Sequence, residues 1–234
     1  GKEYYKNGKL KFEGEYINGK RWNGKGYNIN GYIEFEIKDG KGKTKEYDDD
    51  DILIFEGEYK NGERNGRGKN YDFDDNLKFE GEYKNGERNG KGKEYNYNGK
   101  LIFEGEYLNG ERNGKGKEYY KNGKLKFEGE YINGKRWNGK GYNINGYIEF
   151  EIKDGKGKTK EYDDDDILIF EGEYKNGERN GRGKNYDFDD NLKFEGEYKN
   201  GERNGKGKEY YKNGLTFEGE YLNGKKWNGN GYDI

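Results

Sequence analysis

Carboxylates are the side chains in this sequence that come closest to a catalytic motif. Glu56 and Glu58 stand two residues apart, and the same pairing recurs many times along the chain. Two carboxylates can serve as acid and base in glycoside hydrolysis, but that chemistry needs one pair in a distinctive environment. The sequence has no His, Cys or Ser, so the usual nucleophile–base arrangements cannot be built. We therefore expect a solvated ladder of charges and no catalytic residues.

Two runs of four aspartates are a dense source of oxygen ligands. Ca²⁺ is bound by several oxygens at once, but these runs lack the alternating ligand spacing of a dedicated calcium loop. We regard them as weak calcium candidates, expect no specific metal site, and favour a loop role. They consist of Asp48, Asp49, Asp50 and Asp51, and of Asp163, Asp164, Asp165 and Asp166.

Two further patterns resemble ligand-binding motifs. Gly66-x-Gly68 lacks the strand-then-helix context of a phosphate loop, so no cofactor or small-molecule substrate is expected. Aromatic residues interleaved with Lys resemble a platform for single-stranded nucleic acid. Their regular spacing and a net charge of −2 favour a packed core instead. No nucleic-acid partner is expected.

Three tryptophans fall where we predict turns, and an exposed Trp can anchor an interface. Trp22, Trp137 and Trp227 are therefore candidate contact residues. We favour packing within the irregular unit next to them, with an exposed contact as the alternative.

Composition alone would suggest disorder, because 27% of the 234 residues are hydrophobic and 40% are charged. However, 17% are aromatic, and they recur at fixed spacing, which is typical of repeat proteins. The 46 basic and 48 acidic residues nearly cancel, so no long-range field draws the chain to nucleic acid or an anionic membrane. No run of 18 apolar residues is present.

One sequence motif divides the chain into ten units of 20–24 residues. The motif is Phe-Glu-Gly-Glu-Tyr, followed by x-Asn-Gly and then by Asn-Gly-x-Gly. Residues 1–95 recur unchanged as residues 116–210. We expect one continuous array over residues 1–234. The full units begin at Phe12, Phe55, Phe79, Phe103, Phe127, Phe170, Phe194 and Phe217, and degenerate units begin at Phe35 and Phe150.

Each unit is predicted to be a β-hairpin. Alternation places Phe55, Gly57 and Tyr59 on one face and the two glutamates on the other. Asn61-Gly62 and Asn65-Gly66 are predicted to mark the reversal, and residues 67–71 the return strand. The central glycine is expected to make room for a ring or for the neighbouring backbone. Tyr71 and Phe73 have the wrong parity relative to the glycines, which a bulge at an undetermined position would repair.

The segment Phe79 to Gly92, Phe-Glu-Gly-Glu-Tyr-Lys-Asn-Gly-Glu-Arg-Asn-Gly-Lys-Gly, resembles the MORN repeat family. The resemblance extends over essentially the whole chain, although Phe stands in place of the first Tyr and Tyr in place of the strand-end Trp. It implies a row of hairpins in one long antiparallel sheet. Proteins of this family commonly act as scaffolds in cytoskeletal, ciliary and membrane-junction assemblies. Some bind a partner helix in the sheet groove, and many dimerise.

The predicted fold is therefore all-β, an elongated and twisted single antiparallel sheet of stacked β-hairpins, about 100 Å long at about 4.8 Å per strand. We expect a non-enzymatic scaffold that associates with itself, end to end through its sheet edges or laterally, or with another protein. The alternatives are a module that binds a helix or peptide on its aromatic face, and a tether to membrane lipid or the cytoskeleton. The expected location is the cytoplasm or the cytoskeleton, with an extracellular filament as the alternative.

Overall fold

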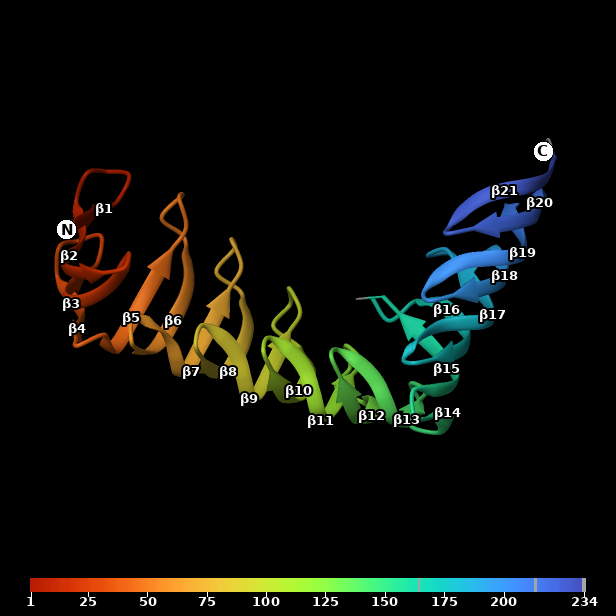
Figure 1. Ribbon diagram of the computed structural model, residues 1–234, viewed down its shortest axis with the longest axis horizontal. Coiled ribbons are helices and arrows are strands. Elements are labelled where there is room, and N and C mark those ends of the chain that lie inside the picture. Colours follow the sequence, from red (N-terminus) through yellow and green to blue (C-terminus); the bar gives the residue numbers. More distant parts are fainter. Residues whose placement is uncertain (164, 213, 233–234) are drawn as a thin grey trace. The chain divides into compact units, whose positions relative to one another are not determined.

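The computed structural model describes residues 1–163, 165–212 and 214–232, and these residues form an all-β structure (Figure 1). They contain 21 strands, and each strand pair is antiparallel. This confirms the predicted fold class of stacked hairpins. The chain divides into two compact units, Gly1–Arg112 and Asn113–Ile234.

In the first unit each strand pairs with the next one along the chain. Its strands are β1 (Lys2–Tyr4), β2 (Leu10–Ile17), β3 (Lys20–Tyr27), β4 (Ile33–Lys38), β5 (Lys41–Tyr47), β6 (Leu53–Lys60), β7 (Glu63–Tyr71), β8 (Leu77–Lys84), β9 (Glu87–Tyr95) and β10 (Leu101–Leu108).

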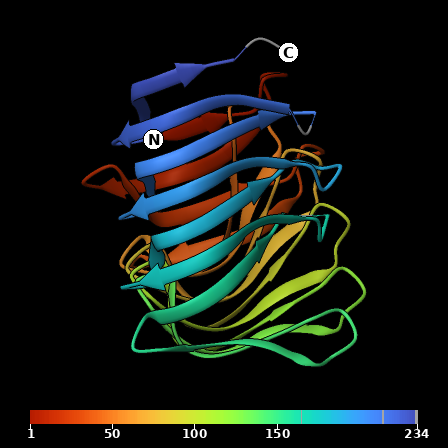
Figure 2. The same ribbon diagram turned by 90° about the vertical axis from the view of Figure 1, so that its right-hand side faces the viewer.

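The second unit repeats this arrangement, and its strands lie side by side in sequence order (Figure 2). Strand β11 begins before the division between the units and continues beyond it. The strands are β11 (Glu111–Tyr119), β12 (Leu125–Ile132), β13 (Lys135–Tyr142), β14 (Ile148–Lys153), β15 (Lys156–Tyr162), β16 (Leu168–Lys175), β17 (Glu178–Tyr186), β18 (Leu192–Lys199), β19 (Glu202–Tyr211), β20 (Gly214–Leu222) and β21 (Lys225–Gly231).

Each full hairpin reverses through a two-residue turn. Asn61 and Gly62 have φ angles of 55° and 72°. Two successive left-handed residues define a type I′ turn, whose twist matches that of the flanking strands. The prediction that Asn61-Gly62 marks the reversal is confirmed. The same prediction for Asn65-Gly66 is wrong, because the return strand β7 has already begun at Glu63.

Asn65-Gly66 instead forms a bulge inside β7. Gly57 pairs with Gly68 and Tyr59 pairs with Arg64, so Glu58 alone faces three residues of the return strand. The Glu58 carboxylate supports the bulge, because its Oε2 accepts a hydrogen bond from the main-chain nitrogen of Arg67 at 3.0 Å. Glu58 therefore has a structural role that the alternation of charges does not predict.

The core is a row of phenylalanine rings that lie over the paired glycines of the sheet. Phe55 and Phe79 are completely buried. A Cβ atom at Gly57 would lie 2.7 Å from Cζ of Phe55 and 2.6 Å from Cα of Gly68. The two glycines thus form a floor without side chains beneath the ring. The prediction that the central glycine makes room for a ring and for backbone is confirmed.

Tyrosines cover the edges of each phenylalanine. The rings of Phe55 and Tyr83, in the following hairpin, are 5.2 Å apart at 82°, and those of Phe79 and Tyr107 are 5.1 Å apart at 85°. This edge-to-face geometry is favourable for aromatic pairs. Where a degenerate hairpin follows, the neighbouring ring is a phenylalanine, as in Phe12–Phe35 and Phe127–Phe150. Because these phenylalanines pack against an aromatic ring of the next hairpin, neighbouring hairpins complete each other's core, as in other solenoids.

The tyrosines that end the return strands lie on the opposite, charged face. Tyr71 donates its hydroxyl to Oε1 of Glu56 at 2.7 Å. A register shift does occur at Tyr71, but the extra residue is Lys78 in the next strand. Tyr71 is therefore not part of the phenylalanine core, and its parity is explained by its position among the charged side chains. Phe73 lies in the following loop and is 74% exposed.

The degenerate hairpins pair over a much shorter length. Strands β4 and β5 share only the pairs Ile37–Gly42 and Lys38–Lys41. Strands β14 and β15 repeat this with Ile152–Gly157 and Lys153–Lys156. By contrast, β6 and β7 remain paired from their turn as far as Phe55. The two strands of a degenerate hairpin are thus joined to each other near the turn and to their outer neighbours elsewhere.

This short pairing shifts the row of central glycines. Ile37 pairs back to Gly24, and Thr44 pairs forward to Gly57, so both occupy positions that are glycine in the other strands. Both side chains are buried. Because Ile37 pairs with Gly42 and not with Thr44, the row is displaced by two residues at this hairpin.

Main-chain hydrogen bonds connect successive turns. The nitrogen of Gly86 donates to the carbonyl of Arg64, and that of Gly110 donates to the carbonyl of Arg88, both at 2.9 Å. Each bond joins the turn of one hairpin to the start of the previous return strand. We call the edge of the sheet where the two-residue turns lie the turn edge, and the opposite edge, where the loops between hairpins lie, the loop edge. The turn edge is therefore held by hydrogen bonds between hairpins.

A side chain on the glycine floor should be costly. A Cβ atom at Gly81 would lie 2.6 Å from the carbonyl oxygen of Lys91 and 2.7 Å from Cζ of Phe79. We expect Gly81→Val to lower the free energy of unfolding by about 3 kcal/mol, the upper end of typical overpacking costs, as measured by urea denaturation. The control is Lys84→Val at an exposed position in the same strand, where we expect a change within about 0.5 kcal/mol. Similar losses in both variants would contradict the glycine floor.

Candidate functional site

A four-residue cluster stands on the aromatic face of the full hairpins. In one example the guanidinium of Arg64 lies 4.2 Å from the ring centroid of Phe55. Its Nε and Nη2 donate to the carboxylate of Glu46, in the preceding return strand, at 2.8 and 2.6 Å. The hydroxyl of Tyr59 donates to the same carboxylate. Arginine thus covers the phenylalanine, and the carboxylate joins one hairpin to the one before it.

The arginine–glutamate pair recurs with a constant separation of 18 residues. Both side chains are mostly buried, and a bidentate pair over an aromatic ring combines charge-assisted hydrogen bonds with a cation–π contact. These charges are therefore committed to holding hairpins together. The other pairs are Arg21 with Glu3, Arg112 with Glu94, Arg136 with Glu118, and Arg179 with Glu161.

The environment of Glu94 keeps it ionised. Burial alone would raise the pKa of its carboxyl group, but the hydrogen bond and charge of Arg112 outweigh burial and hold this pKa below its usual range. Tyr107 adds a hydrogen bond at 2.7 Å. A general acid would need the opposite shift. The cluster is therefore suited to cohesion between hairpins and unsuited to proton transfer.

Two hairpins lack this carboxylate, because Asn70 and Asn185 take its place. Asn70 accepts a hydrogen bond from the hydroxyl of Tyr83 and donates one to the carbonyl of Ile54 at 3.1 Å. Arg88 instead approaches Glu94 of its own hairpin at 3.6 Å. The ladder of arginine–glutamate pairs is thus weakened at this hairpin.

The opposite face carries rows of charge that alternate in sign from strand to strand. The register of the first unit places Lys45, Glu56, Lys69, Glu80, Lys93 and Glu104 in one such row. Neighbours in a row are about 4.8 Å apart, the spacing of strands. Ion pairs on this face, such as Lys208–Glu218 at 3.2 Å, are largely exposed, and such pairs contribute little to stability.

In the second unit a groove of about 1210 Å³ runs along this charged face. Its floor includes the central glycines Gly172, Gly183, Gly196 and Gly207, and its walls are formed by charged residues such as Glu195 and Lys208. The groove therefore has a backbone floor and walls that carry charges of both signs.

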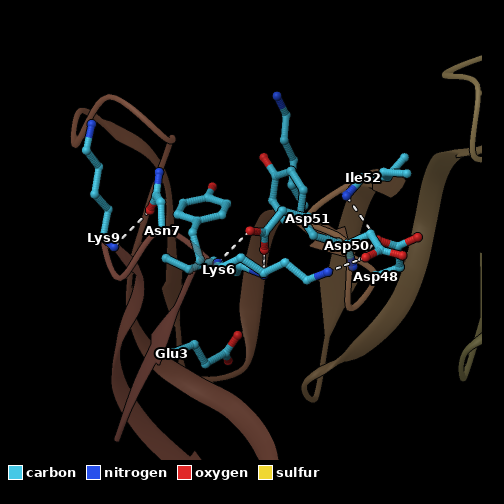
Figure 3. Close-up of polar contacts among 12 residues, drawn as sticks. Glu3, Lys6, Asn7, Lys9, Asp48, Asp50, Asp51 and Ile52 are labelled. Atoms are coloured by element: carbon cyan, nitrogen blue, oxygen red, sulfur yellow. Dashed lines mark hydrogen bonds and ion pairs between the residues drawn. The ribbon is translucent and has the colours of Figure 1, made fainter.

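The first aspartate run forms a loop that closes on itself (Figure 3). Oδ1 of Asp48 accepts hydrogen bonds from the main-chain nitrogens of Asp50 and Ile52, both at 2.9 Å. This is an Asx turn, a common use of aspartate in loops. Asp49 is exposed on the same loop.

Lys6 of the β1–β2 loop (Figure 3) and Lys11 of strand β2 bind the rest of this run. Lys6 pairs with Asp50, and its main-chain nitrogen donates to Oδ2 of Asp51 at 2.6 Å. Nζ of Lys11 reaches Oδ1 of Asp51 at 2.7 Å, and both side chains of this pair are mostly buried. Hydrogen bonds from Lys11 and Lys6 lower the pKa of Asp51. We call these four residues the loop clasp; it connects the β1–β2 loop to the β5–β6 loop.

The second run repeats the loop clasp. Lys126 meets Asp166 at 2.9 Å, and Lys121 pairs with Asp165. Oδ1 of Asp163 accepts a hydrogen bond from the main-chain nitrogen of Asp165 at 2.9 Å. Asp164 lies outside the described residues. Within the part of the chain that the structure describes, no group of three or more acidic side chains is arranged to hold a metal. Lysines contact the carboxylates that a cation would need.

The tryptophans lie in strands, not in turns as predicted. The reversal takes only the two residues of an Asn-Gly turn, so strands β3, β13 and β21 have already begun before each Trp. Trp22 and Trp137 are half-buried against turn glycines of the degenerate hairpins: a Cβ atom at Gly40 would lie 2.7 Å from the Trp22 ring, and one at Gly155 2.8 Å from the Trp137 ring. Trp227 is 71% exposed.

The pairing of these glutamates with the arginines was not predicted from the sequence. A glutamate stands nine residues before five of the eight phenylalanines that begin full units, and this spacing is visible in the sequence. Alternation within one hairpin gives no reason to pair it with an arginine 18 residues later. Only the stacking of hairpins brings Glu46 and Arg64 together.

Consecutive antiparallel hairpins with a shared single-layer core define this chain as a hairpin-repeat protein. A family profile described as MORN repeat matches residues 55–69, 79–100, 103–124, 170–184 and 194–216. A second, described as MORN repeat variant, matches residues 1–18, 41–61, 64–85, 156–176 and 179–200. Together they cover more than half of the chain, which belongs to the MORN repeat family. No curated protein matches it. Among the described residues no helix is long and apolar enough to cross a membrane.

Glu94 should make the stability of the protein depend on pH. Because the pKa of Glu94 is lower in the folded than in the unfolded chain, its contribution is present above the unfolded value of about 4.3 and is lost as pH falls through the folded value. We expect Glu94→Gln to lower the free energy of unfolding by about 2 kcal/mol at pH 7, as for a charged hydrogen bond. Chemical denaturation should show this difference shrinking as the pH falls below about 4. Glu87→Gln, at an exposed position, is the control and should have no such pH-dependent effect.

The loop clasp should contribute more than an exposed ion pair. We expect Lys11→Met and Asp51→Asn each to lower the thermal unfolding midpoint, with the double variant losing less than the sum of the two. The control is the same double-mutant cycle on Lys2 and Glu13. These two side chains lie 3.0 Å apart and are about half exposed, so the two substitutions should show little coupling. Equal coupling in the two cycles would contradict the clasp.

Proposed function

We propose that this protein is a structural scaffold whose charged face binds further copies of the same chain. The observation that carries the proposal is the alternation of sign along each charge row, from Lys45 to Glu104 in the first unit and from Lys160 to Glu218 in the second. Two such rows, displaced by one strand, place lysine opposite glutamate along their whole length. One displacement of about 4.8 Å thus satisfies many weak pairs at once.

The distribution of side chains between the two faces supports this assignment. The phenylalanines, the large tyrosines and the arginine–glutamate pairs hold the hairpins together and leave little of the aromatic layer exposed. The charged face makes mainly exposed contacts. A surface that repeats with so little variation suits an assembly of identical parts better than recognition of one unique ligand. The proposal gives the protein no catalytic role.

A second candidate is a recognition module for another protein. The groove of the second unit favours it, because its glycine floor lets a partner approach the backbone closely and its walls offer both signs of charge. In this candidate the partner lies on the charged face, whereas the family resemblance and the aromatic pattern of the sequence favour the aromatic face. Attachment to membrane lipid has less support, because the balanced charge provides no attraction to anionic headgroups. We propose a location in the cytoplasm or at the cytoskeleton.

Sedimentation velocity over a concentration series, with negative-stain electron microscopy of the same samples, tests the scaffold. We expect species larger than one chain whose population rises with concentration and falls in 1 M salt, where the Debye length is about 3 Å. Glu195→Lys with Glu218→Lys should reduce association, because both substitutions give like charges along one row. Monomers at every concentration would overturn self-assembly and favour the second candidate. Association unchanged in the double variant would exclude this face as the contact.

A further inference from the structure

Asparagine–glycine dipeptides occur in the turns, the bulges and the loops of this chain. Asparagine is thermolabile, and before glycine it rearranges most readily because glycine has no side chain to hinder the reaction. The glycine nitrogen attacks the asparagine Cγ, a C–N bond forms, and the side-chain amide leaves as ammonia with the proton of that nitrogen. Water then opens the cyclic imide at either carbonyl and gives aspartate or isoaspartate. No enzyme or oxidant is required.

We propose that Asn98 is a site of this spontaneous modification in the folded protein and that the turn residue Asn109 is protected from it. Both asparagines, and the glycines that follow them, are exposed to solvent. Access to water therefore does not distinguish the two sites. The difference lies in what must be broken before the glycine nitrogen can reach the side chain.

At Asn109 the reaction requires two hairpins to separate. Asn109 has a φ angle of 50° in the turn between β10 and β11. The nitrogen of Gly110 donates to the carbonyl of Arg88 at 2.9 Å, in the preceding hairpin. Releasing this nitrogen breaks a bond between hairpins and disturbs the packing around it. The cost approaches that of unfolding a larger cooperative segment.

At Asn98 the reaction requires only one short loop to open. The nitrogen of Gly99 donates to the carbonyl of Asn96, two residues before Asn98, at 2.9 Å. The loop is otherwise held by the main-chain nitrogen of Asn96, which donates to the carbonyl of Lys100 at 3.0 Å, and by Oδ1 of Asn96, which accepts hydrogen bonds from the nitrogens of Asn98 and Lys100 at 3.0 Å each. These bonds are all local, so they can break without separating strands.

This loop also contains a defect that favours its opening. Asn96 is 4% exposed, and its Nδ2 is buried without a hydrogen-bond partner. A buried donor without an acceptor destabilises the conformation that buries it. In the preceding loop Asp72 holds the same position and accepts the same two main-chain bonds at 3.0 and 2.9 Å. A carboxylate has only acceptors, so it leaves no such donor unpaired.

The product would resemble the acidic loops of the same chain. Aspartate at position 98 corresponds to Asp74 in the preceding loop and to Asp50 in the loop before it. The modification thus adds negative charge at the loop edge of one hairpin and leaves the hydrogen bonds of the turn edge intact.

Peptide mapping of the folded protein after incubation at mildly alkaline pH tests the proposal. Trypsin releases residues 94–100 and 101–112 as separate peptides, and each occurs once in the chain despite the internal duplication. We expect Asn98 to be converted on the order of tenfold faster than Asn109, which corresponds to about 1.4 kcal/mol of opening free energy. In urea at a concentration that unfolds the chain, the two rates should become similar. Equal rates in the folded protein, or faster conversion of Asn109, would overturn the proposal.

Asn96→Asp is the matched variant, because it reproduces the loop of Asp72 and removes the unpaired donor. We expect it to slow conversion of Asn98 several-fold and to leave the rate at Asn109 unchanged. A circular dichroism spectrum like that of the parent protein would establish that the variant is folded. An unchanged rate at Asn98 in the folded variant would refute the role assigned to the buried amide.

Discussion

A single layer of strands has no second layer to cover its apolar side chains, and the other features of this fold follow from that constraint. Phe55 is completely buried because it lies over Gly57 and Gly68, with Tyr83 at its edge and Arg64 above it. A side chain at either glycine would lift the ring away from the sheet. A solitary hairpin could not supply all of these contacts, so cohesion belongs to neighbouring hairpins and not to any one of them.

The sequence predicted the features that depend on local geometry. The period of two placed Phe55 and Gly57 on one face, and Asn61-Gly62 was recognised as a turn because both residues tolerate positive φ. It did not distinguish Asn65-Gly66 from a second turn, because the same dipeptide also suits a bulge, and only pairing with Glu58 decides between them. Trp22 was predicted to lie in a turn for the same reason, because the turn was taken to extend as far as the second Asn-Gly dipeptide.

Features that depend on stacking were beyond the sequence. The pairing of Glu46 with Arg64 and that of Lys11 with Asp51 join residues 18 and 40 positions apart, and no alternation within one unit connects them. Composition suggested that the repeated carboxylates form a uniform solvated ladder. In the structure they fall into three groups: carboxylates paired with an arginine, carboxylates that accept a hydrogen bond from a bulge, and carboxylates in the rows of the charged face.

The shift of the central row at Ile37 and Thr44 has a consequence for anything that binds along the sheet. A rigid straight ligand that is aligned with the charges before a degenerate hairpin is out of phase with those after it. Such a hairpin therefore separates two stretches of sheet whose charges differ in register. It limits the length over which the charges of a regular partner can stay matched to those of the sheet. A regular partner can therefore stay in register with the sheet only over the full hairpins that lie between two degenerate ones.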